Sequence, residues 1–370
     1  MAPRHAAPSD RLGRVRAFTT LGAVGTLAVI ALLAGVLPTN LVVAQPAGAA
    51  THGALRVAAI TPSGASVAPD AVLEVRFNNP LARNSPLPTI APAVAGSWMR
   101  LSPSALVFET TSGFVPGSAY AVVVPAGAMA TDGTTLKVRV VHRFMVAQGS
   151  ALRLNQLLAE LDYLPLRFVH TGPYDAGSSA VQRGVFAWRF ADVPEQLTSL
   201  WQPSAYNTLT KGALMRFQNV EDLPTTGVAD GQTWHALLAA VDQHKADPDT
   251  YNYVLVTTSL PETLTLYVNF KPIYHTLVNT GISVRPTALA TNPVYLRYTV
   301  TTMSGTNPDG THYDDPGIPW VSYFNGGEAL HGYIRASYGW PQSLGCVEMP
   351  FANAEIVWPY TPIGTLVTVY

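Results

Sequence analysis

The spacing of apolar residues changes twice along the chain, and this change constrains the fold more than any other feature. Between about residues 51 and 148, apolar and polar residues alternate in short segments, which is the period of β-strands. Between 151 and 243 the apolar residues recur every three or four positions, as in helices, and from 250 to 370 they alternate again. The sequence therefore predicts a multidomain, mainly β protein with an N-terminal β-sandwich, a small helical module and a C-terminal all-β domain.

The first β-rich region, residues 51–148, is predicted to form a sandwich of about a hundred residues. Its expected strands are Leu55–Ile60, Ala71–Phe77, Ala105–Glu109, Ala119–Val124 and Leu136–Phe144. The pair Asp132-Gly133 predicts a tight hairpin turn. The order of the segments resembles that of bacterial immunoglobulin-like domains, which implies a structural spacer.

The first fifty residues differ in kind from the rest. Four arginines precede a nearly uncharged apolar run from Ala17 to about Ala44: Arg4, Arg11, Arg14 and Arg16. This pattern is typical of an export segment. Residues 1–50 are either a membrane anchor, since the run exceeds the roughly 20 residues needed to span a bilayer, or a signal peptide with cleavage points near Ala44 and Ala49. We expect membrane contact through this segment alone.

Charge and motifs exclude several functions. The 22 basic and 23 acidic residues nearly cancel, so we expect no nucleic-acid partner. Phosphate-loop and dinucleotide motifs are absent from the sequence, and we expect no cofactor. His312, Asp314 and Asp315 share one loop but lack the spacing of three converging zinc ligands, so no metal is predicted.

The helical module carries apolar residues at three- and four-residue intervals. They are Leu154, Leu157, Leu158, Leu161, Leu214, Phe217, Trp234, Leu237, Leu238 and Val241. The stretch from Gly212 to Gln218, the turn at Thr226-Gly227-Val228 and the pair Thr233-Trp234 resemble the repeat of peptidoglycan-binding domains. This implies contact with glycan, although we expect Trp234 to be a core residue because of its helical spacing.

Cys346 is the only cysteine of the chain, so it has no internal disulfide partner. A thiol attacks an acyl carbon as thiolate, and a free cysteine with a pKa of about 8.5 needs a nearby base at neutral pH. His331 is the natural candidate. Gly332 and Gly345 flank the two residues where the backbone must approach closely. Backbone N–H groups of Gly345 and Cys346 are candidates to stabilise an oxyanion.

The elements His331-Gly332 and Ser343-Leu344-Gly345-Cys346-Val347 closely resemble the catalytic signature of L,D-transpeptidases, and the likeness extends over residues 251–370. The resemblance implies that Cys346 forms a thioester with the third residue of a peptidoglycan tetrapeptide stem. His331 would act as general base and then acid, and an amine of a second stem would resolve the thioester. The products would be cross-linked stem peptides.

The resemblance also assigns supporting roles. The carbonyl of Gly332 or Tyr333 would orient the imidazole, Ser343 would orient the cysteine turn, and Tyr323 and Trp320 would line the substrate groove. Many members have a histidine where this chain has Leu344. A second imidazole beside the thiol is therefore missing.

Three alternatives to cross-linking stay open at this point. Water in place of an amine would make the protein an L,D-carboxypeptidase that trims tetrapeptide stems. A non-catalytic protein that binds the cell wall is the second, and attachment of an outer protein to the stem is the third. Under the enzymatic interpretations we expect carbapenem-type β-lactams to acylate Cys346, and the location to be the cell wall or the outer face of the cytoplasmic membrane.

Overall fold

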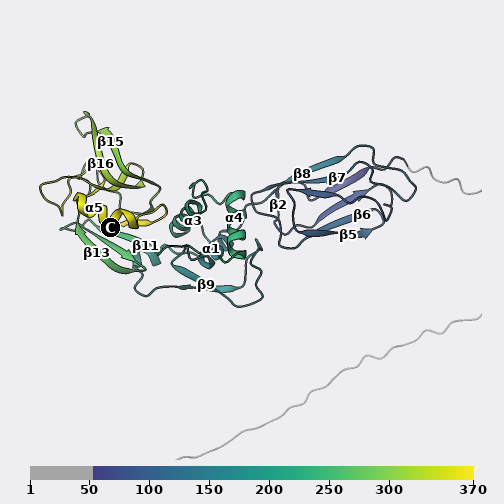
Figure 1. The fold of residues 1–370 in the computed structure, drawn as a ribbon, viewed down its shortest axis with the longest axis horizontal. Coiled ribbons are helices and arrows are strands. Elements are labelled where there is room, and N and C mark those ends of the chain that lie inside the picture. Colours follow the sequence, from purple (N-terminus) through teal and green to yellow (C-terminus); the bar gives the residue numbers. More distant parts are fainter. Residues whose placement is uncertain (1–52) are drawn as a thin grey trace, which may run out of the picture. The chain divides into compact units, whose positions relative to one another are not determined.

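A computed structural model describes residues 53–370 (Figure 1). The predicted signal peptide or membrane anchor of residues 1–50 lies outside the described residues. Among residues 53–370, no helix combines the length and the apolar character needed to cross a membrane.

The first described region is a β-sandwich, as predicted. One sheet has the strand order β1 (Val57–Thr61), β3 (Leu73–Phe77), β6 (Ala105–Thr110), β5 (Gly96–Ser102). The other has the order β2 (Gly64–Val67), β8 (Val140–Val146), β7 (Ala119–Val124), β4 (Thr89–Ala91). Val75 and Phe108 of the first sheet share one core with Val122 and Phe144 of the second. The likeness to immunoglobulin-like domains stays a prediction.

The sequence pattern placed one strand of the sandwich too early. The strand predicted from Leu136 begins at Val140, because Leu136 is bonded into a preceding turn, where its N–H donates to the Ala128 carbonyl at 2.8 Å. The turn at Asp132-Gly133 forms as predicted: Gly133 has φ +84° and donates to the Ala130 carbonyl at 3.0 Å. The strands β2, β4 and β5 were not predicted, since they are short or largely exposed.

The middle region contains the expected helices α1 (Ala151–Glu160), α3 (Thr208–Val220) and α4 (Gly231–Asp242). Each begins after a polar residue whose side chain accepts a hydrogen bond from the backbone N–H three positions on: Ser150, Asn207 and Asp230. The region is not purely helical, however. The long segment between α1 and α3 forms an antiparallel pair, β9 (Leu166–His170) and β10 (Gly184–Trp188), and a short helix, α2 (Glu195–Thr198).

The Phe217-Gln218 pair has a clear structural role. Phe217 is fully buried in the core, while the buried Gln218 amide holds the loop that follows α3. Its Nε2 donates to the Val228 carbonyl at 3.0 Å and to Thr233 Oγ1 at 3.2 Å, and its Oε1 accepts from Gly227 N at 2.9 Å. One side chain thereby fixes the turn and the start of α4. Trp234 is 1% exposed, which confirms it as a core residue.

We predict that Gln218→Ala lowers the free energy of unfolding by about 1–3 kcal/mol, because it leaves buried backbone groups of the turn without partners. Urea denaturation followed by circular dichroism measures the change. Gln243→Ala, at an exposed position just after α4, is the matched control and should change stability by less than about 0.5 kcal/mol. Equal effects of the two substitutions would contradict the assigned role.

The C-terminal region packs two sheets against each other. The first has the order β13 (Lys271–Leu277), β12 (Thr263–Val268), β11 (Asn252–Thr257), β19 (Leu366–Val369), β14 (Thr291–Pro293). The second has the order β15 (Leu296–Thr306), β16 (His312–Asn325), β17 (Glu328–Gly332), β18 (Val347–Met349). Val254 and Leu266 of the first sheet meet Leu330 and Val347 of the second in a common core.

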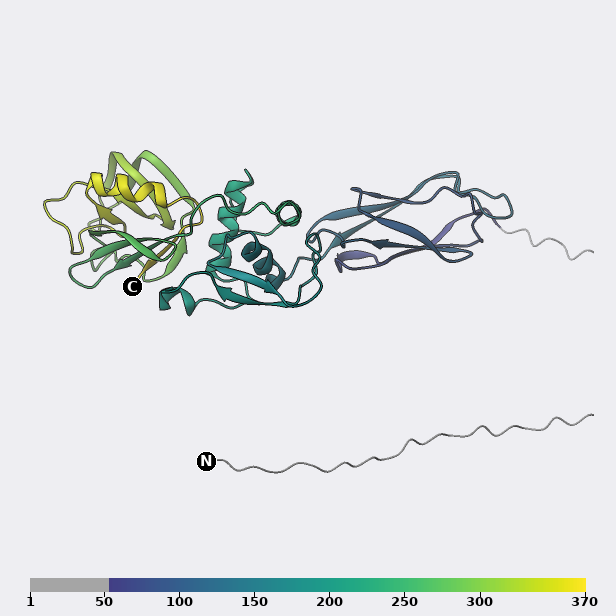
Figure 2. The ribbon, with the colours of Figure 1, turned by 60° about the horizontal axis from the view of Figure 1, so that its bottom comes forward.

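One helix of this region, α5 (Phe351–Val357), was not predicted from the alternating pattern. It contacts β16 and β17, beside the second sheet (Figure 2), and continues into a short 3-10 turn, η1 (Trp358–Tyr360). Ala354 and Val357 of α5 are buried in the shared core. The C-terminal region is therefore mainly β, as expected, but not all-β.

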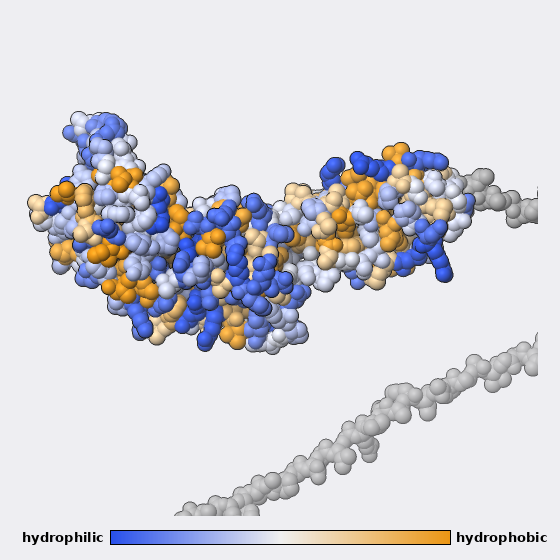
Figure 3. Space-filling view, viewed as in Figure 1, coloured by the Kyte–Doolittle hydropathy of each residue, from blue (hydrophilic) through white to orange (hydrophobic). Residues whose placement is uncertain are grey.

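One edge strand of the first sheet is β13, and part of its exposed surface is apolar. Ile273 is 47% exposed and Leu277 44% exposed, and the nearby Leu260 is 71% exposed. Figure 3 shows apolar residues gathered over the part of the C-terminal region that carries β13. An accessible apolar edge strand has backbone groups free to pair with another chain.

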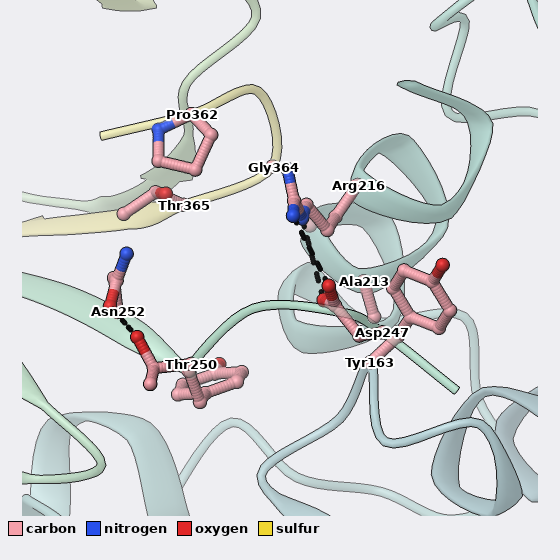
Figure 4. Close-up of a pocket in the computed structure, with 11 residues that line it drawn as sticks. Tyr163, Ala213, Arg216, Asp247, Thr250, Asn252, Pro362, Gly364 and Thr365 are labelled. Atoms are coloured by element: carbon pink, nitrogen blue, oxygen red, sulfur yellow. Dashed lines mark hydrogen bonds and ion pairs between the residues drawn. The ribbon is translucent and has the colours of Figure 1, made fainter. Parts of the chain in front are cut away.

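The helical module and the C-terminal sheets share a core. Tyr253, Phe270 and Leu366 of the C-terminal region are buried in the same cluster as Leu214 and Phe217 of α3. A small cavity of about 30 Å³ lies where the helical module meets the C-terminal sheets, a contact called the seam below (Figure 4). There Arg216 Nη2 donates to Asp247 Oδ1 at 3.1 Å and also contacts Asp249. The segment after α4 is thus held to α3 by ion pairs.

Two glycines allow the backbones to meet at the seam. A Cβ on Gly212 of α3 would lie 2.7 Å from the Gly364 carbonyl oxygen and 2.7 Å from Leu366 Cδ2. A Cβ on Gly364, which has φ +92°, would lie 2.4 Å from the Gly212 carbonyl oxygen. Contacts this short leave no room for any side chain, so helix and sheet are packed against each other through main chain.

We predict that Gly212→Ala destabilises the protein by about 1–3 kcal/mol, because the added methyl group overpacks the seam. Helix propensity alone predicts the opposite sign, a gain of about 1 kcal/mol. Thermal and urea denaturation decide between them. Gly172→Ala is the control, since its Cβ meets nothing closer than 3.5 Å. Stabilisation by Gly212→Ala would show that the main chains at the seam can move apart at little cost in free energy.

Candidate active site

The groove of the second C-terminal sheet contains both reactive candidates. Its volume is about 910 Å³, and Cys346 and His331 both line it. The groove is also lined by Asp315, Tyr323, Glu328, Tyr333, Arg335, Gln342, Leu344 and Glu348. Cys346 and His331, which are 15 positions apart in the sequence, therefore line the same groove.

His331 lies on β17 and is 3% exposed. Its Nδ1 is 3.0 Å from the Gly332 carbonyl oxygen, which can only accept, so Nδ1 carries the proton and Nε2 is left as the basic nitrogen. Burial lowers the pKa of His331, whereas the backbone hydrogen bond to Gly332 raises it. Burial therefore favours the neutral imidazole that a general base must be.

The other carbonyl considered for orienting the ring is engaged elsewhere. The Tyr333 carbonyl accepts from the Tyr338 hydroxyl at 2.5 Å, and the Tyr333 hydroxyl donates to Asp315 Oδ2 at 3.2 Å. The Tyr333 ring stands edge-on to the imidazole, with 6.0 Å between centroids. Tyr333 thus borders His331 with its ring, while Gly332 supplies the carbonyl.

Cys346 is half-buried, and its thiol donates to the Gly327 carbonyl at 3.7 Å. Burial raises the pKa of Cys346 to about 12, and a backbone hydrogen bond from Ala329 opposes this. At neutral pH the sulfur is then almost entirely thiol. Nucleophilic attack needs a base that takes the proton as the new bond forms. The His331 imidazole, which lines the same groove, can act as that base.

The turn before Cys346 is held by Ser343. This side chain is 1% exposed, and its Oγ donates to the Cys346 carbonyl at 2.6 Å and accepts from Gly345 N at 3.1 Å. Gly345 has φ +116°, a conformation that glycine adopts at no steric cost. Because its N–H is committed to Ser343, Gly345 fits the orienting role better than the oxyanion role. The Cys346 N–H is then the remaining candidate donor.

The two aromatic residues expected to line the groove, Tyr323 and Trp320, lie in different places. Tyr323 lines the groove and packs in the small cluster that includes Cys346. Trp320 does not line it: it packs on the larger core and lies 5.5 Å from the ring of Trp358. Trp320 and Tyr323 lie three positions apart on β16, and residues three apart on a strand face opposite sides of the sheet.

Sequence reasoning missed the charged residues of the groove. Arg335 donates from Nε and Nη2 to both carboxylate oxygens of Glu348, at 2.7 and 2.8 Å. Glu328 accepts from Ala288 N at 3.1 Å and from Asn325 Nδ2 at 3.0 Å. Glu348 directly follows the cysteine motif and was available as a signal, but Arg335 lies in an irregular segment that carries no periodic pattern.

Leu344 and the loop that contains His312 and Asp314 were also singled out by the sequence. Leu344 lines the groove and gives it an apolar wall beside the cysteine turn. His312 and Asp314 form an exposed pair at 3.4 Å. Within residues 53–370, no group of three or more His, Cys, Asp or Glu side chains is arranged to hold a metal ion.

Comparison with protein families covers two parts of the chain. Residues 252–369 match the L,D-transpeptidase catalytic domain, YkuD. Residues 202–237, which contain α3 and the first half of α4, match a putative peptidoglycan binding domain. The groove with Cys346 and His331 lies within the first match. The C-terminal region of this chain is thus similar in sequence to the L,D-transpeptidase catalytic domain.

Solved structures of the same kind are similar to this chain. An L,D-transpeptidase from Mycobacterium smegmatis shares 12% identity, over 85% of this chain and 99% of that chain, with a TM-score of 0.30. L,D-transpeptidase 3 from Mycobacterium tuberculosis shares 10%, over 85% and 98%, with 0.30. The catalytic domain of an E. faecium L,D-transpeptidase shares 24%, over 34% and 98%, with 0.30. No curated protein sequence matches the chain.

We predict that alkylation of Cys346 by iodoacetamide is slow at pH 7 and still accelerates above pH 10, because its raised pKa keeps the thiolate scarce until high pH. His331→Ala should slow the reaction near neutral pH and leave the rate at high pH nearly unchanged, since the base is then no longer needed. Intact mass against time gives the rates, with Cys346→Ala as the unlabelled control. A plateau near pH 8.5 would contradict the burial of the thiol.

Proposed function

We propose that this protein is a peptidoglycan L,D-transpeptidase that works through a thioester on Cys346. The observation that carries the proposal is the groove lined by both Cys346 and the buried His331, within the region that matches the L,D-transpeptidase catalytic domain. An acyl transfer through a cysteine needs just such a pair.

In the first half-reaction, His331 Nε2 accepts the thiol proton while Cys346 Sγ bonds to the carbonyl carbon of the third residue of a tetrapeptide stem. The carbonyl electrons move to oxygen, and the Cys346 N–H would donate to this oxyanion. The carbonyl then re-forms and the C–N bond to the terminal D-amino acid breaks. His331 returns the proton to the leaving amine, and a thioester remains.

In the second half-reaction, an amine of another stem attacks the thioester carbon, and His331 takes one of its protons. The C–S bond breaks as the carbonyl re-forms, and the proton returns to the Cys346 sulfur. The cross-link contains the new amide bond, and the enzyme is restored. Water in place of the amine gives an L,D-carboxypeptidase with the same residues in the same roles.

The remaining parts fit action on the cell wall. We propose that the region matching the peptidoglycan binding domain holds the wall polymer near the groove. The export and wall location proposed for the protein rest on the arginines and the apolar run of residues 1–50.

The test is the reaction of the chain from residue 53 with a tetrapeptide-stem muropeptide, followed by intact mass of protein and products. We expect a Cys346-linked acyl adduct, loss of the terminal D-residue and formation of dimers. Cys346→Ala should show none of the three. A carbapenem should add to the wild-type protein and block the reaction, because its ring opens on the same sulfur.

The outcomes separate the alternatives. Loss of the D-residue without dimers assigns the carboxypeptidase, and dimers assign the transpeptidase. Neither product nor adduct, in a protein whose circular dichroism shows it folded, overturns the enzymatic proposal in favour of a non-catalytic wall-binding protein.

A further inference from the structure

A carboxylate lies beside the candidate base. The strands β17 and β18 pair in parallel, with His331 opposite Glu348 in the register. Side chains of register partners on neighbouring strands point to the same face of a sheet. Both residues line the groove, and His331 is 3% and Glu348 5% exposed. In such a site an unpaired carboxylate would stabilise the imidazolium and take the base away from the reaction.

Arg335 is paired with the Glu348 carboxylate. Its two hydrogen bonds to Glu348, at 2.7 and 2.8 Å, form a bidentate pair. A third contact, from Nη2 to the Gln342 carbonyl at 3.1 Å, and the Tyr333 ring, 4.7 Å from the guanidinium carbon, hold the group in place. The cation is therefore fixed on Glu348 and not free to reach across the groove.

The remaining charged neighbours of His331 are few among the described residues. From β16, Asp315 acts on the imidazole and accepts from the Tyr333 hydroxyl. Glu328, on β17 itself, is bound to Ala288 and Asn325. Glu355, on the packed helix α5, is exposed. Glu348 and Arg335 act on the His331 pKa in opposite directions, with Glu348 raising it and Arg335 lowering it.

We propose that Arg335 and Glu348 are a positioning pair for the candidate catalytic histidine, in which Arg335 cancels the charge of the carboxylate aligned with His331 and so keeps His331 as a neutral base. The pair acts through His331 and does not touch the reacting atoms. Glu348 also has a structural role. Its backbone N–H donates to the Asn279 carbonyl and its carbonyl accepts from the Asn279 N–H, both at 2.9 Å, so β18 is joined to the loop after β13.

The test is a charge cycle read by NMR titration of His331, identified by its absence in His331→Asn. Arg335→Gln leaves the carboxylate unpaired and should move the titration midpoint of His331 up by about 1 pH unit. Glu348→Gln leaves the guanidinium unpaired and should move the midpoint down. Arg335→Gln combined with Glu348→Gln should bring it back to within a few tenths of the wild-type value. Arg335→Lys should stay near wild type because the charge is kept.

The result that overturns the proposal is a set of single variants that shift the midpoint in the same direction, or a double variant that does not restore it. Thermal unfolding of each variant shows that it is folded, and the double variant keeps the test valid if one single variant does not fold. The titration needs no substrate, so it stands apart from the proposed function on which the kinetic role rests. If the enzyme acylates as proposed, the acid limb of its pH–rate profile should move with the midpoint in each variant.

Discussion

The parallel pairing of β17 and β18 is the interaction on which the site depends. It sets His331 opposite Glu348 and so brings Cys346, two residues earlier, to the same groove. Parallel neighbours need a connection that returns the chain to its starting end. Here that connection contains Arg335, which fastens back onto Glu348, and the Ser343 turn that presents the cysteine. The loop is therefore part of the site and not merely a link.

Burial has opposite effects on the two reactive groups. It lowers the pKa of the imidazole and raises the pKa of the thiol, and so favours the uncharged form of each. A resting ion pair of thiolate and imidazolium, which many cysteine enzymes hold, is disfavoured in such a site. The proton then moves during the attack, and correct placement of the base matters more than its resting charge.

The sequence predicted those features that depend on residues close to one another along the chain. Alternation predicted the β character of the C-terminal region, and helical spacing predicted helices where α1, α3 and α4 lie. The grouping of Cys346 with His331 followed from motif residues. Trp320 packs on the core side of β16 and Tyr323 lines the groove, since the two residues lie three positions apart on one strand. The Arg335–Glu348 pair was missed since it joins a strand to an irregular loop, and no period in the sequence records such a contact.

The glycines of the seam give the molecule a mechanical property. At Gly212 and Gly364 the main chain of α3 lies against the main chain just before β19, with no side chain between them. β19 is an inner strand of the five-stranded sheet and lies between β11 and β14. A force applied to α3 would therefore reach β19 and its neighbour β11 through contact between main chains, without a flexible side chain to absorb it.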